Sequence, residues 1–547
     1  MKNTFIPVGE TLANTFAHAG VTHVFGFPGE TSLPLYIGMQ KTSGIQHVLA
    51  RCPRCAAYMA ESYARVSGKL GICDAPGGIG SPFVTPALHE ANNSSTPLLF
   101  LASGVDQHKK GRWTTSQCDQ QHLFKAVTKA TYLLDEAENT GKMLYEAMHT
   151  AITPRTGPVF FEIPADIFAA ESSAKKLPKF SINYPNYRIS PDKKLLDEVV
   201  ACLHRAKSPV IVAGGGVFLS KAVNEVQTLH ATTGIPIATT LNGKGIVDEK
   251  NKNVLGVTGS KGSVEVNSYV QQSDCIVVLG SKLGDKSTNQ YAWPRPGQTV
   301  IHVDADPKEL KHLQEGYLPV LADIKVFVSE LSELLKDWSI KPIVLPEKKI
   351  FWEEGATHQL CQLITDILPE DSILVADASV ASGWAGAAVT FSKNQRLVNP
   401  RGSGSIGYAL PAAIGASFAR PDKKIIAIGG DGGFAISMHE METAARYRLP
   451  IIYFLLNNNR LGLIDKHATA LLKGKPVSDQ FIDVEWCAIA QSMGWAATRI
   501  DSPRELKNLI PLLSSIQKPL LIDYRISPNE MAPDFFITLN HTKRASL

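Results

Sequence analysis

The feature of this sequence that most limits its possible folds is the repeated alternation of short apolar runs, glycine-rich turns and helical segments. In the first third of the chain, "VTHVFGFPG", "KLGICDAPGG" and "TPLLFLASG" each read as a strand that ends in a turn, and "AAYMAESYARVSG" reads as a helix between strands. Strands that are apolar on both faces are typical of a parallel sheet covered by helices on either side. The pattern therefore predicts βαβ units.

The same alternation returns twice further along the chain. "SPVIVAGGGV", "SDCIVVLGSKLGD" and "QTVIHVDADP" form one set, and "SILVADAS", "KKIIAIGGDGG", "LPIIYFLLNNN" and "PLLIDYRIS" form another. Two segments rich in Ser, Pro and Lys, 169–194 and 339–350, show no hydrophobic period and read as linkers. We predict the fold class α/β, with three doubly wound parallel-sheet domains over residues 1–170, 185–338 and 351–547.

Charge and hydropathy exclude several classes of function. The formal charge of +4 comes from 55 basic and 51 acidic side chains spread along all 547 residues, without the basic stripe that nucleic acid binding requires. No apolar run reaches about 18 residues, and the first residues lack the apolar core of a signal peptide. We expect a cytoplasmic protein with neither a nucleic acid nor a membrane partner. Its eight cysteines are expected to be reduced thiols.

One glycine-rich motif in the last third of the chain indicates a specific binding site. In "IIAIGGDGGFAIS", the glycine-rich segment 429–433 surrounds Asp431 between a strand and a helix, and Asn458 follows 27 residues later at the end of the next strand. Glycines at such a turn let backbone N–H groups approach phosphate oxygens, and the helix N-terminus adds partial positive charge. One carboxylate and one amide oxygen can hold Mg²⁺ together with diphosphate oxygens. The motif predicts a diphosphate site with its metal.

Together with "VFGFPGETSLPLY", "MAESYARVSGKLGIC", "TTLNGKG" and "GSIGYALPAAIGA", this motif resembles the thiamine diphosphate enzymes of the acetolactate synthase, pyruvate oxidase and benzoylformate decarboxylase superfamily. The resemblance covers nearly the whole chain. It implies three domains in the order pyrimidine-binding, central and diphosphate-binding. It also implies a homodimer or homotetramer with the active sites between subunits. The implied reaction is decarboxylation of a small-molecule 2-oxo acid, followed by transfer of the acyl anion equivalent to an acceptor or its release.

The resemblance further assigns roles to individual residues. The metal ligands would be the side chains of Asp431 and Asn458 and the backbone carbonyl of Arg460. Ile406 matches the bulky apolar residue that wedges between the two cofactor rings, although the same residue could serve as plain core, and Gly404 matches the residue whose carbonyl receives the pyrimidine amino group. The full set of expected cofactor-binding residues is Gly404, Ile406, Gly430, Asp431, Gly432, Gly433, Asn458, Ser379 and Val380.

The sequence departs from the family pattern in the stretch "RCPRCAAYMAESYAR". Related enzymes usually carry here a glutamate that bonds the pyrimidine ring, and an ungapped alignment places Pro53 at that position. Proline has no side-chain acceptor and no proton to exchange. Glu61, two helical turns on, reads as an ordinary helix residue. The candidate catalytic or substrate-facing residues are Pro53, Glu30, Ser116, Gln117 and His467.

Three interpretations of this departure stay open. The chain can be an enzyme that works without the glutamate, as the glyoxylate carboligase branch does, or a noncatalytic or regulatory cofactor-binding paralogue. Alternatively, Cys52 or Cys55 has acquired a role. The sequence C-P-R-C at a helix start resembles the thioredoxin redox motif. A zinc clip is the weaker version of this idea, because no second ligand pair with suitable spacing follows.

The central domain leaves its ligand open, because related enzymes hold FAD, ADP or nothing there. The turn "AGGGV" (213–217) can take a phosphate, and Asp304 or Asp306 could bond a ribose or cap the helix expected after them. Lys282 and Lys286 stand where acetolactate synthases carry arginines, and lysine lacks the bidentate fork. FAD is therefore a possible cofactor that these lysines argue against, and a FAD-dependent 2-oxo acid oxidase is a further alternative.

Overall fold

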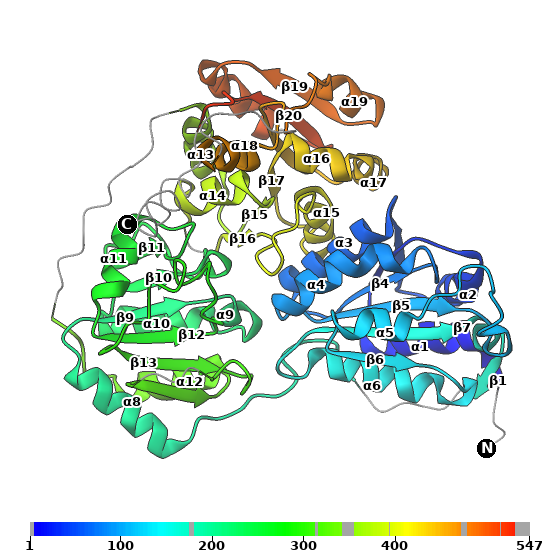
Figure 1. Cartoon of the computed structure of the whole chain (residues 1–547), viewed down its shortest axis with the longest axis horizontal. Coiled ribbons are helices and arrows are strands. Elements are labelled where there is room, and N and C mark those ends of the chain that lie inside the picture. The colour runs from blue at the N-terminus through cyan, green and yellow to red at the C-terminus, as the bar shows by residue number, and fades with distance from the viewer. Residues whose placement is uncertain are drawn as a thin grey trace. The chain divides into compact units, whose positions relative to one another are not determined.

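The computed structural model describes residues 5–173, 180–311, 315–341, 355–392, 394–471, 479–514 and 516–530. Residues 174–179 and 342–350 of the two expected linkers lie outside these ranges. The chain divides into two compact units. The first contains residues 1–187, 400–422 and 437–449, and the second contains residues 188–399, 423–436 and 450–547. Figure 1 shows the elements of both units along the chain.

The first unit is built on a parallel sheet of six strands. Its central strands are buried along their length, which explains their uninterrupted apolar sequences. In sheet order the strands are β3 (Gln46–Leu49), β2 (His23–Gly26), β4 (Gly71–Ala75), β5 (Leu98–Gly104), β7 (Pro158–Pro164) and β6 (Ala130–Leu133). A separate antiparallel pair joins β1 (Phe5–Pro7) to β8 (Glu171–Ser173).

Helices cover both faces of this sheet. Helices α3 (Pro53–Ser67) and α4 (Thr85–Asn93) lie on one face, and α1 (Val8–Ala19) and α6 (Thr140–Ile152) lie on the other (Figure 1). The remaining helices of this unit are α2 (Leu33–Lys41), α5 (Gln120–Lys125), α7 (Ala165–Phe168), α15 (Ala409–Ala419) and α17 (Met441–Arg446).

Helix α15 comes from the C-terminal third of the chain but packs against α3. The two helices touch backbone to backbone, because a Cβ added at Gly415 would lie 2.0 Å from the carbonyl oxygen of Met59. Every residue from Ala409 to Ser417 is buried. This helix therefore forms part of the core of the first unit.

The second unit contains two further six-stranded parallel sheets. The first has the order β11 (Val254–Val257), β10 (Ile237–Thr239), β9 (Pro209–Ala213), β12 (Cys275–Leu279), β13 (Thr299–Asp304) and β14 (Tyr317–Leu321). Its helices are α8 (Lys193–Arg205), α9 (Gly216–Leu219), α10 (Val223–Thr233), α11 (Val264–Gln272) and α12 (Ile324–Leu334).

The other sheet of this unit carries the glycine-rich motif. Its order is β16 (Arg396–Val398), β15 (Ile373–Ala376), β17 (Ile425–Gly430), β18 (Ile452–Asn457), β20 (Leu520–Arg525) and β19 (Ala496–Ile500). Its helices are α13 (Ala356–Ile367), α14 (Val380–Ala387), α16 (Asp431–Ser437), α18 (Gly462–Leu471), α19 (Trp486–Ser492) and α20 (Ile510–Ser514).

The predicted fold class is confirmed, since each of the three sheets is parallel and flanked by helices. The eight cysteines are free thiols, as expected. The prediction of a helix after "VIHVDADP" is wrong for the described residues that follow it. Residues 307–309 form a turn instead, in which the Asp306 carboxylate accepts a hydrogen bond from the backbone N–H of Lys308 (2.9 Å). An aspartate bonded two residues ahead favours such a turn as readily as a helix start.

Candidate functional site

Three neighbouring parallel strands of the second unit, β15, β17 and β18, end at the same edge of their sheet. Ala376 of β15 pairs with Ile428 of β17, and Gly430 of β17 pairs with Leu456 of β18. The loops that follow these strands carry most of the residues expected to hold a diphosphate and its metal. The carboxyl edge of a parallel sheet is the usual position of such a site.

Asp431 is the first residue of α16 and directly follows β17. Its side chain is 4% exposed and accepts a hydrogen bond from the Gly432 N–H (3.0 Å). Burial raises the pKa of this carboxyl to about 6, while hydrogen bonds from the backbone N–H groups of Gly432 and Asn459 partly oppose the rise. Gly432, the next residue, lies against the side chain of Leu461, so the loops after β17 and β18 touch.

The loop after β18 turns sharply at Asn459, whose φ is 56°. Beside it, Asn458 Oδ1 accepts a hydrogen bond from the backbone N–H of Arg460 (3.3 Å). A Cβ at Gly462 would lie 2.9 Å from the Asn458 amide nitrogen, so a glycine there leaves room for this side chain. The Arg460 guanidinium pairs with Asp465 (3.2 Å). These contacts fix the position of Asn458 next to the loop of Asp431.

The glycines around Asp431 fall into two groups. A Cβ at Gly432 would lie 2.8 Å from the end of the Leu461 side chain, so a larger residue here would require that side chain to move. A Cβ at Gly430 would meet no atom within 4 Å, which leaves open space at the end of β17. Gly433 is buried in the first turn of α16. A strand end with open space in front of a helix N-terminus suits a phosphate group.

The loop after β15 holds a strained residue. Ser379 precedes α14 with φ 71° and ψ −132°, a conformation that L residues rarely adopt. Its carbonyl accepts hydrogen bonds from Lys261 Nζ (3.3 Å) and Ser382 Oγ (3.0 Å). Val380, half-buried, is the first residue of α14. Strain of this kind is common where a backbone group must face a ligand.

In the first unit, three candidate residues lie on loops at the carboxyl edge of the sheet. Pro53 is the first residue of α3, which follows β3. Glu30, exposed, opens a short 3-10 helix after β2. Ser116 has φ 68°, and its carbonyl oxygen would lie 2.1 Å from a Cβ at Gly78, in the loop after β4. The strands β3, β2 and β4 are neighbours, so these loops share one edge.

The other two candidates are placed differently. Gln117 is exposed, and its side-chain oxygen accepts a hydrogen bond from the Gly111 N–H (3.0 Å) within its own loop. His467 lies half-buried on α18 in the second unit. Their assignment to substrate binding stays a prediction.

Gly404 and Ile406 lie on the segment before α15, within the first unit. Gly404 adopts φ 73°, a left-handed conformation that favours glycine, and no atom lies within 4 Å of where its Cβ would be. The Ile406 side chain is 38% exposed. An isoleucine this exposed beside an open glycine is not a plain core residue, which supports the wedge interpretation.

Comparisons with known proteins agree with this geometry. Three family models match, described as the N-terminal TPP binding domain of thiamine pyrophosphate enzymes (residues 6–123), their central domain (196–331) and their C-terminal TPP binding domain (377–524). An acetolactate synthase large subunit of Lactococcus lactis is 30% identical over 536 residues, which is 95% of this chain and 92% of the relative.

The chain belongs to the thiamine pyrophosphate enzyme family. Thiamine pyrophosphate is another name for thiamine diphosphate, so the predicted resemblance is confirmed. Other similar relatives are an acetolactate synthase large subunit of Corynebacterium glutamicum (29% identical; 92% of this chain, 84% of the relative) and a probable one of Methanococcus aeolicus (27%; 92% and 90%).

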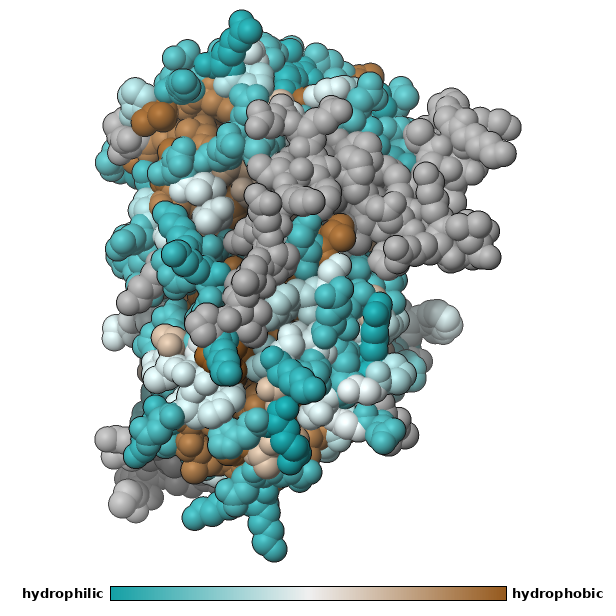
Figure 2. Space-filling view, turned by 90° about the vertical axis from the view of Figure 1, so that its left-hand side faces the viewer, coloured by the Kyte–Doolittle hydropathy of each residue, from teal (hydrophilic) through white to brown (hydrophobic). Residues whose placement is uncertain are grey.

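Within the described part of this thiamine pyrophosphate family member, no helix is both long enough and apolar enough to cross a membrane. On the face drawn in Figure 2, hydrophilic residues cover much of the surface and hydrophobic ones show in separate patches between them. Such a mixture is ordinary for a protein surface.

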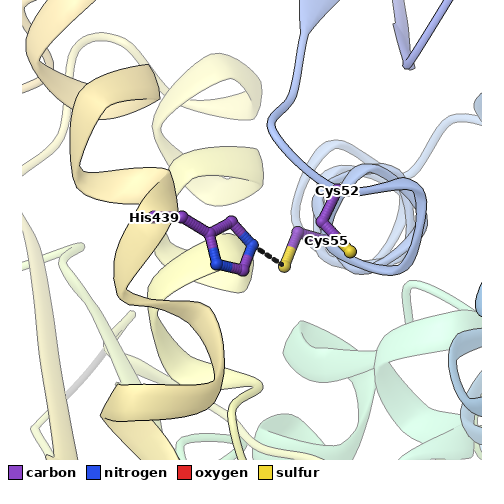
Figure 3. A group of neighbouring side chains, drawn as sticks. All are labelled: Cys52, Cys55 and His439. Carbon is purple, nitrogen blue, oxygen red and sulfur yellow. Dashed lines mark hydrogen bonds between the residues drawn. The ribbon is translucent and has the colours of Figure 1, made fainter.

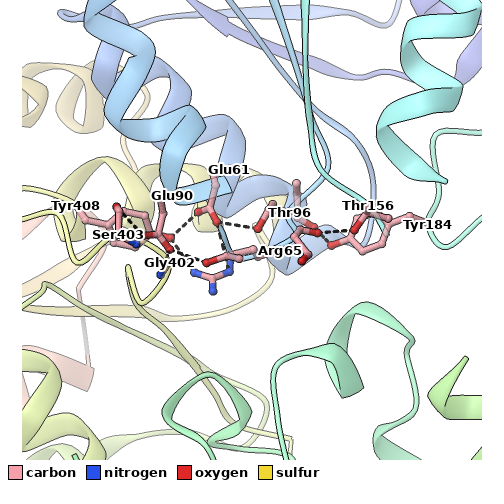
Figure 4. Close-up of polar contacts among 12 residues, drawn as sticks. Glu61, Arg65, Glu90, Thr96, Thr156, Tyr184, Gly402, Ser403 and Tyr408 are labelled. Carbon is pink, nitrogen blue, oxygen red and sulfur yellow. Dashed lines mark hydrogen bonds and ion pairs between the residues drawn. The ribbon is translucent and has the colours of Figure 1, made fainter. Parts of the chain in front are cut away.

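Sequence reasoning missed two buried carboxylates that hold the segment of Gly404 and Ile406 (Figure 4). Glu90 of α4 accepts hydrogen bonds from the backbone N–H groups of Gly402 (2.8 Å) and Ser403 (2.6 Å). Glu90 is fully buried and also accepts a hydrogen bond from Ser94 Oγ (2.7 Å). This carboxylate therefore fixes the backbone that leads into Gly404.

Glu61 is the second such carboxylate. It accepts hydrogen bonds from the Tyr408 hydroxyl (2.6 Å) and the Thr96 hydroxyl (2.9 Å), and pairs with Arg65 (3.4 Å). A fully buried carboxylate needs these partners, so Glu61 has a structural role that its interpretation as an ordinary helix residue, rather than a substitute for the missing glutamate, did not include. A signal was present in the sequence, since Glu61 stands among small and apolar residues on a helix buried from Cys55 to Arg65.

The glycine turn of the central domain has an explanation that needs no phosphate. A Cβ at Gly214 would lie 2.3 Å from the carbonyl oxygen of Gly280, and one at Gly216 would lie 2.7 Å from the Gly280 Cα. The two glycines thus let two loops pack backbone to backbone. Lys282 pairs with Glu309 (3.9 Å) and Lys286 with Asp285 (3.3 Å). The expectation against FAD stays a prediction.

Proposed function

We propose that this chain is a thiamine diphosphate- and Mg²⁺-dependent enzyme of the acetolactate synthase type. It decarboxylates a 2-oxo acid and transfers the acyl unit to an acceptor or releases it. The observation that carries the proposal is the contact between two loops at the ends of β17 and β18, in which Gly432, next to the buried Asp431 carboxylate, lies against Leu461 of the loop of Asn458. The acetolactate synthase relatives over nearly the full length support the reaction class.

The residues present fit the metal and the diphosphate. A carboxylate oxygen, an amide oxygen and the Arg460 carbonyl form the all-oxygen donor set that Mg²⁺ prefers. The raised pKa of Asp431 reflects a carboxylate buried without full compensation, and a bound cation would favour its ionised form. The N–H groups at the start of α16 and the open space at Gly430 suit the diphosphate, and Ser379 and Val380 would contact it from the neighbouring loop. When bound, the cofactor supplies a thiazolium ring that acts as an electron sink.

The chain's own residues would then bind and orient the cofactor and the substrate. The exposed side chain of Ile406 would separate the two cofactor rings, and the Gly404 carbonyl would orient the pyrimidine. Pro53 cannot hold or move a proton, so that task falls to other groups at the same edge, of which Glu30 is a carboxylate. Ser116 and Gln117 offer hydrogen bonds to a substrate. His467 is a further candidate to face it.

We further propose a cytoplasmic homodimer or homotetramer. In the single chain several large apolar side chains are exposed in the first unit, among them Trp113, Ile79 and Phe83. Apolar side chains exposed to this degree suit burial against a second subunit. Sedimentation would measure the assembly.

The first experiment tests the cofactor site. Calorimetric titration with thiamine diphosphate, with and without Mg²⁺, should give at least about tenfold tighter binding with the metal, since each tenfold corresponds to only about 1.4 kcal/mol. The Asp431→Ala protein should lose this difference. The matched control Asp422→Ala removes an exposed carboxylate of the first unit and should keep it. Equal binding with and without Mg²⁺ in the unmodified protein would remove the basis of the proposal.

A second experiment tests catalysis. Release of CO₂ from a panel of 2-oxo acids identifies the donor, and NMR follows proton exchange at C2 of the bound thiazolium ring. Exchange no faster than in free cofactor would favour the noncatalytic paralogue instead. Replacing Pro53→Glu should increase exchange if the missing carboxylate limits the rate.

A further inference from the structure

Two cysteines and a histidine from distant parts of the chain meet in the first unit (Figure 3). Cys52 precedes α3 as its N-cap residue and Cys55 lies in the first turn, so both thiols lie at the same end of the helix. His439 belongs to the 3-10 helix Met438–Glu440 and points its ring at Cys55. The Cys55 Sγ lies 3.6 Å from His439 Nε2, and the three ligand atoms all lie within 4.8 Å of one another. Among the described residues this is the one such group of three.

These separations suit a tetrahedral metal ion. With zinc–sulfur bonds of about 2.3 Å and zinc–nitrogen bonds of about 2.05 Å, a sulfur and a nitrogen of one tetrahedron lie about 3.6 Å apart and two sulfurs about 3.8 Å apart. The Cys55–His439 distance already has this value. The Cys52 sulfur lies within 4.8 Å of both other ligand atoms, so its two separations exceed the tetrahedral values by at most about 1.2 Å.

The segment of the two cysteines and the segment of His439 are also held together by other contacts. Glu440, which follows His439, is fully buried, and its carboxylate accepts hydrogen bonds from the Arg51 N–H (3.0 Å) and from the Thr443 hydroxyl (2.6 Å). Arg51 directly precedes Cys52. Pro53 fixes φ between the two cysteines. The ligands therefore come from two segments that are already tied together without an ion.

The chemistry of the group selects the kind of ion. Two thiolates and an imidazole favour zinc and related ions over Mg²⁺ or Ca²⁺, which take oxygen ligands. Cys52 and His439 are half-buried, so an ion can enter from solvent, whereas Cys55 is fully buried. Glu440 lies 3.6 Å from His439 Nε2 and adds negative charge beside the ligands.

We propose that Cys52, Cys55 and His439 bind a zinc-type divalent cation through two thiolates and one imidazole, with the fourth position open to water. This site is separate from the magnesium ligands of the second unit and does not depend on the proposed reaction. A bound ion would fix the first turn of α3, and with it Pro53, to the segment of His439. A disulfide between Cys52 and Cys55 is the competing use of the two thiols, and it leaves His439 without a role.

Cobalt titration of the reduced, chelator-treated full-length protein tests the proposal. We expect one Co²⁺ per chain with the near-ultraviolet absorption of thiolate-to-cobalt charge transfer, displaced by Zn²⁺. The variants Cys55→Ser and His439→Ala should each weaken binding by more than about 100-fold, since even groups that only orient a ligand contribute about 10 to 100-fold. Cys202→Ser, which changes a half-buried thiol on α8 in the second unit, should bind like the unmodified protein.

Circular dichroism of each variant checks that it folds. If Cys55→Ser fails to fold, His439→Ala decides, because its ring is partly exposed. Absence of the charge-transfer band, or equal cobalt affinity in His439→Ala and unmodified protein, overturns the metal site. A Cys52–Cys55 disulfide found by mass spectrometry, together with no cobalt binding after reduction, would assign the pair to thiol redox chemistry instead.

Discussion

Replacing Tyr408→Phe removes one hydroxyl from the network that holds the segment before α15. That hydroxyl donates to Glu61 at 2.6 Å and accepts from Arg65 at 3.4 Å, and all three side chains are buried. The ring and its packing against Tyr58 remain. The change therefore removes these two hydrogen bonds and leaves the packing of the ring in place.

The expected cost follows from the partners that remain. A hydrogen bond to a charged group contributes about 1.5 to 3 kcal/mol, and removal of one partner of a buried ion pair costs about 3 to 5 kcal/mol. Glu61 keeps Thr96 and Arg65, so the lower range applies. We expect the free energy of unfolding to fall by about 2 kcal/mol. Because Ile406 lies two residues before Tyr408, cofactor affinity should fall as well.

The penalty should also depend on pH. Burial raises the pKa of Glu61, and the bond from Tyr408 lowers it, so Tyr408→Phe raises the pKa further. A carboxyl whose pKa is raised by folding stabilises the fold below its unfolded pKa, and this contribution is lost as pH rises through the folded value. The difference between variant and unmodified protein should therefore be larger at pH 8 than at pH 5.

Urea unfolding at both pH values measures these differences. The matched control is Tyr447→Phe, whose half-buried hydroxyl donates to the His47 carbonyl at 3.3 Å, and we expect a change below about 1 kcal/mol. If Tyr408→Phe unfolds within about 0.5 kcal/mol of the unmodified protein at pH 8, or if its loss of stability is larger at pH 5, the Tyr408 hydroxyl does not stabilise the fold in this way.

Two further changes test the packing and the central domain. Gly415→Ala should destabilise the protein by about 1 to 3 kcal/mol, because its Cβ would meet the Met59 carbonyl oxygen. The control Gly284→Ala, with no atom within 4 Å of the added Cβ, should change the midpoint of urea unfolding little. Equal midpoints for the two variants would contradict the close helix contact. Burial raises the pKa of Asp304 to about 6. As the pH rises from 4 to 8, Asp304→Asn should therefore gain stability relative to the unmodified protein, by at most about 3 kcal/mol. A stability difference between the two proteins that stays the same at both pH values would contradict this expectation.

The sequence predicted the three sheets and the loop of Asp431 because both depend on local patterns. Buried parallel strands are apolar throughout, and a glycine-rich turn at a strand end can be recognised from a few consecutive residues of sequence. The positions of Asp431 and Asn458 at the ends of adjacent strands followed from the same pattern.

Other features depend on contacts between distant residues and left no local signal. Glu90 bonds to Ser403, and Cys55 lies beside His439, over more than 300 residues of sequence in each case. The packing of α15 on α3 joins segments that hydrophobic periodicity assigns to different domains. The sequence pattern predicted a helix after Asp306, but aspartates that accept hydrogen bonds from backbone N–H groups two residues ahead are equally compatible with a short turn.

The division of the chain into units has a consequence for fragments of this protein. The backbone passes from one unit to the other after residues 187, 399, 422, 436 and 449. No single cut can therefore liberate either unit intact. A recombinant piece that starts near residue 351 would carry α15 without its binding surface on α3, and its side chains that α3 covers, which are mostly apolar, would face water.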